Sequence, residues 1–229
     1  KENKVRMFVH LKTKTIYSLL EGAIFAKALA DQCCKFKMPA VGITDRANLF
    51  GALEFSEVLS DNGIQPIIGC QLPMSFKEAD LKKLRVTDRL SMLFLATNEL
   101  GYRNLMELSS KFFLNDTYRF EGMSIQEINK FSDGLICLSG GDESPINNLL
   151  RDNRIKEAEN FLLHFKRTFG DRFYLEMNRH PLGDNFSMKV NTESNILEMA
   201  DTHNLPLVAT NDVYFLDKEL YEPHDALLC

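Results

Sequence analysis

The sequence lacks the long apolar stretches that a membrane-spanning protein needs. Its 229 residues contain no run of about 18 consecutive apolar residues, so we expect no transmembrane helix. The charged residues 1–6 lead directly into a short apolar run and show no apolar core of the kind found in secretory signal peptides. We therefore expect a cytoplasmic protein that does not contact a membrane.

Cysteine is scarce, and its spacing excludes two classes of small domain. The chain has an odd number of cysteines, and none of them shows Cys-x-x-Cys spacing: Cys33, Cys34, Cys70, Cys137 and Cys229. This pattern excludes zinc fingers and argues against a disulfide framework. We expect reduced cysteines that pack as small apolar groups, as is usual for a cytosolic protein.

Excess positive charge is also missing, and so are the common catalytic signatures. The net charge is −5, so we do not expect the domain to bind DNA by itself, because affinity for DNA comes mainly from basic side chains that neutralise its phosphates. No Ser/His/Asp or Cys/His nucleophile arrangement stands out, and Gly140-Gly141 alone is a weak phosphate-loop signal. Any role with nucleic acid must come from a local patch or from other parts of a larger protein.

What the sequence does contain is an alternation of short apolar runs and amphipathic segments. The runs predict strands at residues 5–11, 40–44, 65–71, 90–96, 134–139, 172–177 and 205–209. The amphipathic segments predict helices at residues 24–36, 49–59, 98–113, 124–129, 144–150, 154–169, 186–203 and from 218 onward. We expect a surface insertion at 76–88 and a loop at 114–123. Seven strand–helix units predict a mostly parallel α/β barrel of the (β/α)7 type, related to the TIM barrel.

The first strand end carries the most informative group of polar residues. Lys12 and Lys14 point the same way because strand side chains alternate, and Glu21 lies in the loop before the first helix. In a barrel of this kind, functional residues gather where the strands end, because the loops there share one mouth. We expect these three side chains to converge on one pocket. Histidines at positions 12 and 14 would make half of a metal site.

Several stretches at strand ends resemble one family. Residues 10–22, which include Tyr17-Ser18-Leu19-Leu20-Glu21-Gly22, resemble the first motif of the PHP (polymerase and histidinol phosphatase) domain, and more narrowly that of bacterial DNA polymerase III alpha subunits. Residues 43–52, 209–212 and 224–228 resemble the same family, so the resemblance covers essentially the whole chain. It implies a distorted (β/α)7 TIM-like barrel of the PHP type over residues 1–229. It also implies an N-terminal piece of a longer polymerase, with residues from about 218 leading into the next domain.

The resemblance also implies a site, and this chain departs from it. In family members with an intact site, histidines and carboxylates hold a metal cluster that activates water for phosphoester hydrolysis. Where the family has its paired histidines, this chain has Lys12 and Lys14. Where the family has an aspartate, a further histidine and a glutamate, this chain has Glu21, Arg46 and Gln71.

The remaining positions of that site depart from the pattern as well. Ser91 and Tyr214 stand where the family has histidines, and Gly141 stands where it has a cysteine. Only the aspartate, Asp212, is retained. Protonated lysine and arginine cannot ligate a divalent metal and repel it. We therefore expect no metal, no cofactor and no catalytic residue in this domain.

The same charges suggest what replaces the metals. Lys12, Lys14 and Arg46 bring positive charge to positions where Glu21, Asp45 and Asp212 remain as anions. We expect a salt-bridge network, with Lys12 or Arg46 within about 4 Å of Asp212 or Glu21. Two plainer interpretations stay open: the lysines are simply solvated, and Asp45 is a helix N-cap.

Function follows from the resemblance alone. It implies that the full-length protein is a DNA-directed DNA polymerase, a nucleotidyltransferase that uses Mg²⁺ in DNA replication and contacts DNA through domains outside this chain. This domain would then support the polymerase core domains of the same chain and dock the proofreading exonuclease subunit, alongside other replicase subunits. The alternative is a residual metal-dependent phosphoesterase or 3′–5′ exonuclease of the PHP family.

Overall fold

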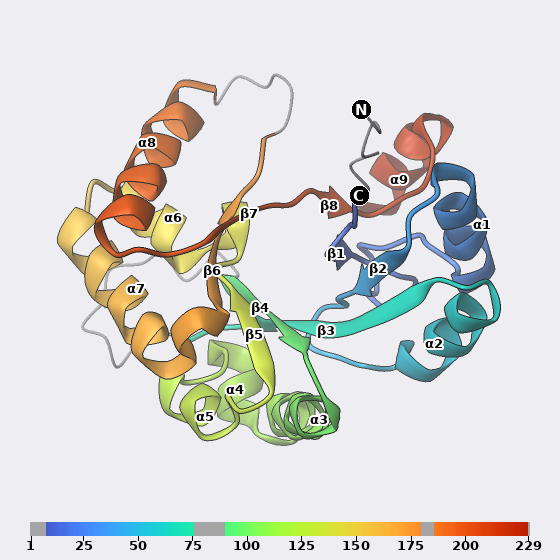
Figure 1. The fold of residues 1–229 in the computed structure, drawn as a ribbon, viewed down its shortest axis with the longest axis horizontal. Helices are drawn as coiled ribbons and strands as arrows, with labels where there is room; N and C mark the ends of the chain where they lie inside the picture. The colour runs from blue at the N-terminus through green and yellow to red at the C-terminus, as the bar shows by residue number, and fades with distance from the viewer. Residues whose placement is uncertain (1–7, 76–89, 180–185, 229) are drawn as a thin grey trace, which may run out of the picture.

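The computed structural model describes residues 8–75, 90–179 and 186–228 (Figure 1). Its strands are β1 (Lys12–Thr13), β2 (Ala40–Ile43), β3 (Gln65–Pro73), β4 (Ser91–Ala96), β5 (Leu135–Leu138), β6 (Phe173–Met177), β7 (Leu207–Ala209) and β8 (Asp212–Val213). Six of them form a sheet in the order β2-β3-β4-β5-β6-β7, and β1 pairs with β8.

The helices surround these strands in three groups. They are α1 (Ala26–Phe36), α2 (Ala52–Asp61), α3 (Glu99–Leu114), α4 (Asp116–Glu121), α5 (Ile125–Lys130), α6 (Pro145–Arg151), α7 (Ile155–Phe169), α8 (Phe186–Thr202) and α9 (Tyr221–Leu228). Short 3-10 turns are η2 (Gly141–Glu143), η3 (Gly170–Arg172) and η4 (Lys218–Leu220). Figure 1 shows α1, α2 and α9 on one side, α6 to α8 on the other, and α3 to α5 between them. In the described part of the chain, no helix is long and apolar enough to cross a bilayer.

Most strand pairs are parallel, as the sequence predicted, and β4 is the exception. β2 and β3, β5 and β6, and β6 and β7 pair in parallel, but β4 runs antiparallel to both β3 and β5. The backbone N–H of Thr97 donates to Gly134 O at 2.9 Å, which holds the end of β4 beside the start of β5. The α3–α4–α5 connection thus returns the chain to the same edge. Alternation of strands and helices in the sequence does not report this reversal.

The described strands form an α/β half-barrel and not a clearly complete (β/α)7 barrel. β7 pairs with β6, whereas β8, two residues further on, pairs with β1 instead. Backbone hydrogen bonds from Gly42 N to His10 O (2.7 Å) and from Thr44 N to Thr13 O (3.0 Å) join the β1 segment to β2. A Cβ atom on Gly42 would lie 2.6 Å from Leu11 O, so glycine permits this close approach. These strands are too short to form a continuous ladder around the ring.

The core lies on both faces of the sheet. Met92 and Phe94 of β4 belong to the large cluster that packs beneath the helices, whereas Leu93 and Leu95 join Leu138 in a second cluster. This alternation buries β4 on both faces, as expected for a strand between a helical layer and a barrel interior. A further cluster fills the space among α1, α2 and β2.

Two predicted elements differ in the structure. Of the predicted first strand at 5–11, residues 5–7 lie outside the described chain and residues 8–11 are not part of a strand. The first described strand is Lys12–Thr13, which pairs with β8. The predicted loop at 114–123 contains α4, whose N-cap Asn115 accepts hydrogen bonds from Thr117 N and Tyr118 N. The predicted insertion at 76–88 also lies outside the described residues.

Candidate functional site

The sequence-predicted site residues meet at one end of the half-barrel, which we call the mouth. Arg46 follows β2 and forms an isolated parallel bridge with Gln71 of β3. Lys12 of β1 lies in register with Asp212 of β8. Ser91 joins them from the start of β4: because that strand is antiparallel, its first residue lies where its neighbour β3 ends. The structure thus brings together residues that are up to 200 positions apart (Asp212 minus Lys12).

Lys12 is buried between two carboxylates. Its Nζ lies 3.0 Å from Glu176 Oε1 and 2.8 Å from Asp212 Oδ1, and the side chain is only 1% exposed. Burial alone would lower the pKa of Lys12, but the charges of Glu176 and Asp212 outweigh it and raise the pKa above its ordinary value. The ion pair between Lys12 and Asp212 that the sequence predicted is therefore confirmed.

Both carboxylates around Lys12 are held by further hydrogen bonds. Glu176 Oε2 accepts from the backbone N–H of Gly140 at 3.1 Å, and its Oε1 accepts from the Thr210 hydroxyl. Asp212 Oδ2 accepts from Asn178 Nδ2 at 3.1 Å. The contacts to Glu176 Oε2 and Asp212 Oδ2 satisfy the oxygens that the ammonium group does not reach, which a buried charge requires.

Arg46 forms the second group of ion pairs. Its Nε lies 2.7 Å from Glu21 Oε1, and its two terminal nitrogens donate to both oxygens of Glu143 at 3.1 and 2.9 Å. The planar guanidinium thus makes the two-pronged contact that suits a carboxylate. The predicted pair between Arg46 and Glu21 is confirmed, and Glu143 is a partner that the sequence analysis missed.

Gln71 and Ser91 complete the environment of Glu143. Gln71 Nε2 donates to Glu143 Oε2 at 2.7 Å, and the Ser91 hydroxyl donates to the same oxygen at 2.6 Å. Burial alone would raise the pKa of Glu143, but the hydrogen bonds and charge of Arg46, with help from Ser91, hold it below its ordinary value. Gln71 and Ser91, two positions that the resemblance aligned with metal ligands, thus donate hydrogen bonds to a carboxylate.

Lys14 lies in the same mouth without a carboxylate in contact. Its side chain is fully buried, and its Nζ donates to the backbone oxygen of Thr44. Burial, together with the charges of Arg46 and Lys12, lowers the pKa of Lys14 to about 8, although the charges of Asp212 and Glu143 act in the opposite direction. Since Lys12 and Lys14 are both buried, the interpretation that they are solvated lysines is wrong.

Asp45 has a different role from the one that its position after a strand suggests. It does not cap α2, whose N-cap is Gly51. Its carboxylate instead accepts from Thr15 N (2.7 Å), Thr15 Oγ1 (2.7 Å) and Ser18 Oγ (2.6 Å). The N-cap interpretation is therefore wrong, because the loop after β1 folds back over the end of β2 and supplies the donors.

Gly141 and Tyr214 lie at the edges of the mouth. Gly141 has φ +60°, and an added Cβ atom would lie 2.7 Å from Asn178 Oδ1 and 2.9 Å from Glu176 Oε1. A cysteine at this position would collide with the groups that hold Lys12. Burial raises the pKa of Tyr214, and the nearby carboxylates of Asp212 and Glu143 add to the effect. The phenol is thus held neutral beside Asp212.

Glu143 and Glu176 are the functional residues that sequence reasoning missed as site members. Glu176 lies near the end of a predicted strand, so its position at the mouth could be predicted, but its ion pair with Lys12 could not. Glu143 lies in η2 after Gly140-Gly141 and has no periodic pattern around it. The charge count gave no signal, because the three cations Lys12, Lys14 and Arg46 were already matched in number by Glu21, Asp45 and Asp212.

The chemical capacity of the mouth follows from its donors. Lys12 and Arg46 are bonded to the carboxylates that could otherwise ligate a cation, and a protonated lysine or arginine has no lone pair to offer. Among residues 8–75, 90–179 and 186–228, no group of three or more His, Cys, Asp or Glu side chains could hold a metal ion. The residues at the mouth therefore do not fit a metal cluster.

Comparisons with known proteins identify one family. The family model of the PHP domain matches residues 10–180. The chain is 44% identical over 223 residues to the DNA polymerase III alpha subunit of Caulobacter vibrioides, and 35% identical over 223 residues to that of Rickettsia bellii. Each alignment covers 97% of this chain but 19% and 18% of the relative, so the chain spans about a fifth of their length.

Solved structures support the fold. An amidohydrolase from Chromobacterium violaceum, with bound sulfate and no metal, matches with a TM-score of 0.55 at 10% identity, over 96% of both chains. A protein described as a metal-dependent phosphoesterase, from Bifidobacterium adolescentis, matches with a TM-score of 0.55 at 12% identity, over 97% of this chain and 96% of that one. At such identities the likeness concerns the fold alone. The family model, which matches residues 10–180, shows that this chain belongs to the PHP domain family.

Proposed function

We propose that this chain is the PHP domain of a replicative DNA polymerase III alpha subunit in which the PHP site binds no metal and hydrolyses nothing. In the longer protein, template-directed DNA synthesis and its Mg²⁺ would belong to other domains, in the cytoplasm. This domain supports those domains and docks the proofreading exonuclease subunit of the replicase. The names of the relatives and the family match support the polymerase assignment.

The observation that carries the loss of hydrolysis is the position of the Lys12 ammonium. It bonds Asp212, the retained family ligand, at 2.8 Å, and it is also bonded to Glu176. A metal ion at Asp212 would have to displace a buried, doubly paired cation and then tolerate Arg46 and Lys14 nearby. The electrostatic cost of three cations around one site opposes any metal-activated water.

The proposed docking role follows from the proposed loss of hydrolysis. A polymerase whose own PHP site cannot hydrolyse DNA depends on a separate subunit for proofreading. A rigid domain with an inert mouth remains useful as a platform, and ion pairs keep it rigid. We propose the exonuclease subunit as the partner on this ground and on the resemblance.

The competing function is a residual metal-dependent phosphoesterase or 3′–5′ exonuclease. The test is hydrolysis of p-nitrophenyl phosphate and of 3′-labelled single-stranded DNA by the purified chain with Mn²⁺, Zn²⁺ or Mg²⁺ added. Asp212→Asn is the matched control, because it removes the retained ligand but not a contaminating nuclease. We expect equal background rates in both proteins. Hydrolysis that disappears only in Asp212→Asn would establish the competing function.

The docking proposal is tested separately by titrating the chain with its cognate exonuclease subunit in a calorimeter. We expect saturable binding at micromolar concentrations or below, with serum albumin in place of the chain as the control. Absence of association at these concentrations would overturn the docking role and leave the loss of hydrolysis unaffected.

A further inference from the structure

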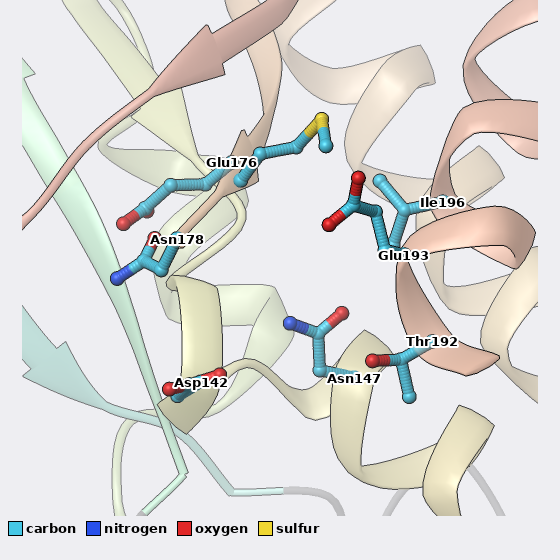
Figure 2. A pocket seen from close by; sticks show the side chains of 8 residues that line it. Asp142, Asn147, Glu176, Asn178, Thr192, Glu193 and Ile196 are labelled. Atoms are coloured by element: carbon cyan, nitrogen blue, oxygen red, sulfur yellow. The ribbon is translucent and has the colours of Figure 1, made fainter. Parts of the chain in front are cut away.

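A small cavity lies beside the mouth and shares Glu176 with it. Its volume is about 40 Å³, and it opens between the η2–α6 segment and α8 (Figure 2). Polar residues that line it are Asp142, Asn147, Glu176, Asn178, Thr192 and Glu193. A site of this volume has room for about three water-sized groups.

Asn147 leaves a buried hydrogen-bond acceptor without a partner beside this cavity. Its side chain is 9% exposed, and Figure 2 shows it projecting between η2 and α8. The Nδ2 group donates to Gly141 O at 2.6 Å, which fixes the orientation of the amide, because the opposite orientation would place two oxygens together. Its Oδ1 atom is buried without a hydrogen-bond partner. A buried acceptor of this kind requires a donor or a cation.

The negative charges around the cavity favour a cation over a neutral hydrogen-bond donor. Glu176 is committed to Lys12, but the carboxylates of Asp142 and Glu193 also line the space. Arg151 lies 3.7 Å from Asp142, and Arg179, which pairs with Glu193, is 74% exposed. Two carboxylates and an amide oxygen thus line one small space.

We propose that this cavity binds a small, hard divalent cation such as Mg²⁺ or Mn²⁺. Oxygen-only ligands suit these ions, and the volume leaves room for the ion with one or two of its waters. Only two of the protein ligands are carboxylates, so the site is weaker than a three-carboxylate site. It is distinct from the mouth positions occupied by Lys12 and Arg46, and it does not depend on the proposed function.

Binding at this place would connect two parts of the chain. Asp142 belongs to η2, next to Glu143, whereas Glu193 belongs to α8. A cation shared by these residues would hold α8 against the turn that carries the partner of Arg46. The ion would therefore stabilise the mouth from the side without entering it.

The experiment is a Mn²⁺ titration of the whole chain, followed by the electron paramagnetic resonance signal of free Mn²⁺. Two variants break the same ion pair with opposite consequences. Glu193→Gln removes a ligand, and we expect it to weaken binding about tenfold or more. Arg179→Gln removes the competing cation and frees the carboxylate, so we expect it to strengthen binding. A purely structural role for the pair would change both variants alike.

Each remaining outcome has a definite meaning. Equal effects of the two variants, or no saturable binding at millimolar Mn²⁺, would overturn the cation site and leave water as the occupant of the cavity. Binding that is lost in Asp212→Asn but kept in Glu193→Gln would place the ion at the mouth. That result would overturn this inference and, separately, the metal-free mouth of the proposed function.

Discussion

At the scale of single residues, the mouth is a set of buried charges that need one another. Lys12, Glu176 and Asp212 together bury three charges, and such a group contributes little net stability compared with apolar side chains of the same size. The removal of one member is a different matter, because it leaves the others unpaired in a low-dielectric environment. The network therefore defines one geometry of the mouth and penalises every other.

Substitution Lys12→Met tests this dependence. It leaves Glu176 and Asp212 buried without their cation, and we expect a loss of about 3–5 kcal/mol in the free energy of unfolding. Urea denaturation measures the change. Lys27→Met, on the exposed face of α1, is the control and should change stability by no more than about 0.5 kcal/mol.

A triple variant separates charge from packing in the same experiment. Lys12→Met combined with Glu176→Gln and Asp212→Asn removes all three charges, so it should recover part of the loss. Equal stability of Lys12→Met and Lys27→Met would contradict the account, because Lys12 would then not be needed to neutralise its neighbours.

Lys14 makes a prediction about pH. Burial lowers its pKa to about 8 in the folded chain, below the unfolded value of about 10.4. Between these values the unfolded state binds more protons, so this group makes folding more favourable as pH rises. Relative to Lys14→Met, the wild type should gain up to about 1.4 kcal/mol per pH unit between pH 8 and pH 10.

Chemical denaturation of both proteins across this range measures the difference in stability. The comparison with Lys14→Met cancels the titration of every other group that the substitution does not disturb. A difference that stays constant with pH would show that Lys14 keeps an ordinary pKa, and that it is not desolvated in the way the structure indicates.

At the scale of elements, the loop after β1 is held against the end of β2 by two kinds of contact. Asp45 accepts hydrogen bonds from Thr15 and Ser18, and Arg46 pairs with Glu21 further along the same loop. His224 of α9 lies 2.6 Å, through its Nε2, from the backbone oxygen of Glu21, so the loop is also joined to α9. The loop thus links three elements at the mouth.

Asp45→Ala tests the first of these contacts. It leaves the Thr15 and Ser18 donors without their buried acceptor, and we expect a cost of about 3 kcal/mol. Amide hydrogen exchange should become faster across residues 15–22 while α7 stays protected. Asp31→Ala, at an exposed position of α1, is the matched control. Unchanged exchange in this loop would contradict the anchoring role of Asp45.

The sequence predicted elements better than their directions. Most helices and strands lie within a few residues of their predicted places, because apolar periodicity reports burial of a helix face or a strand directly. The antiparallel course of β4 was not predictable, since it depends on how α3, α4 and α5 return the chain. β8 was missed because its two residues are too few to show any alternation.

The site was predictable to a similar degree. Charge substitutions at Lys12 and Arg46 predicted ion pairs with Asp212 and Glu21, because cations that replace ligands need anions nearby. Glu143 was not predicted as a partner of Arg46, because only the tertiary structure brings η2 to Arg46. The cysteine position at Gly141 likewise became intelligible only when its left-handed backbone and its closeness to Asn178 were known.

At the scale of the whole molecule, the ion pairs join distant parts of the half-barrel. Lys12 connects β1 with β6 and β8, and Arg46 connects the end of β2 with η2, which lies beyond β5. A metal cluster would draw the same strand ends together. We propose that side-chain cations take over that structural role here, and the proposed loss of hydrolysis would follow from the absence of such a cluster.

Metal content of the purified chain tests this claim most directly. After gel filtration in chelator-treated buffer, inductively coupled plasma mass spectrometry should find no tightly bound Mn, Zn or Fe in stoichiometric amount, because weakly held ions are removed by this step. Two or three such ions per chain, released when Asp212 is changed to Asn, would contradict the account.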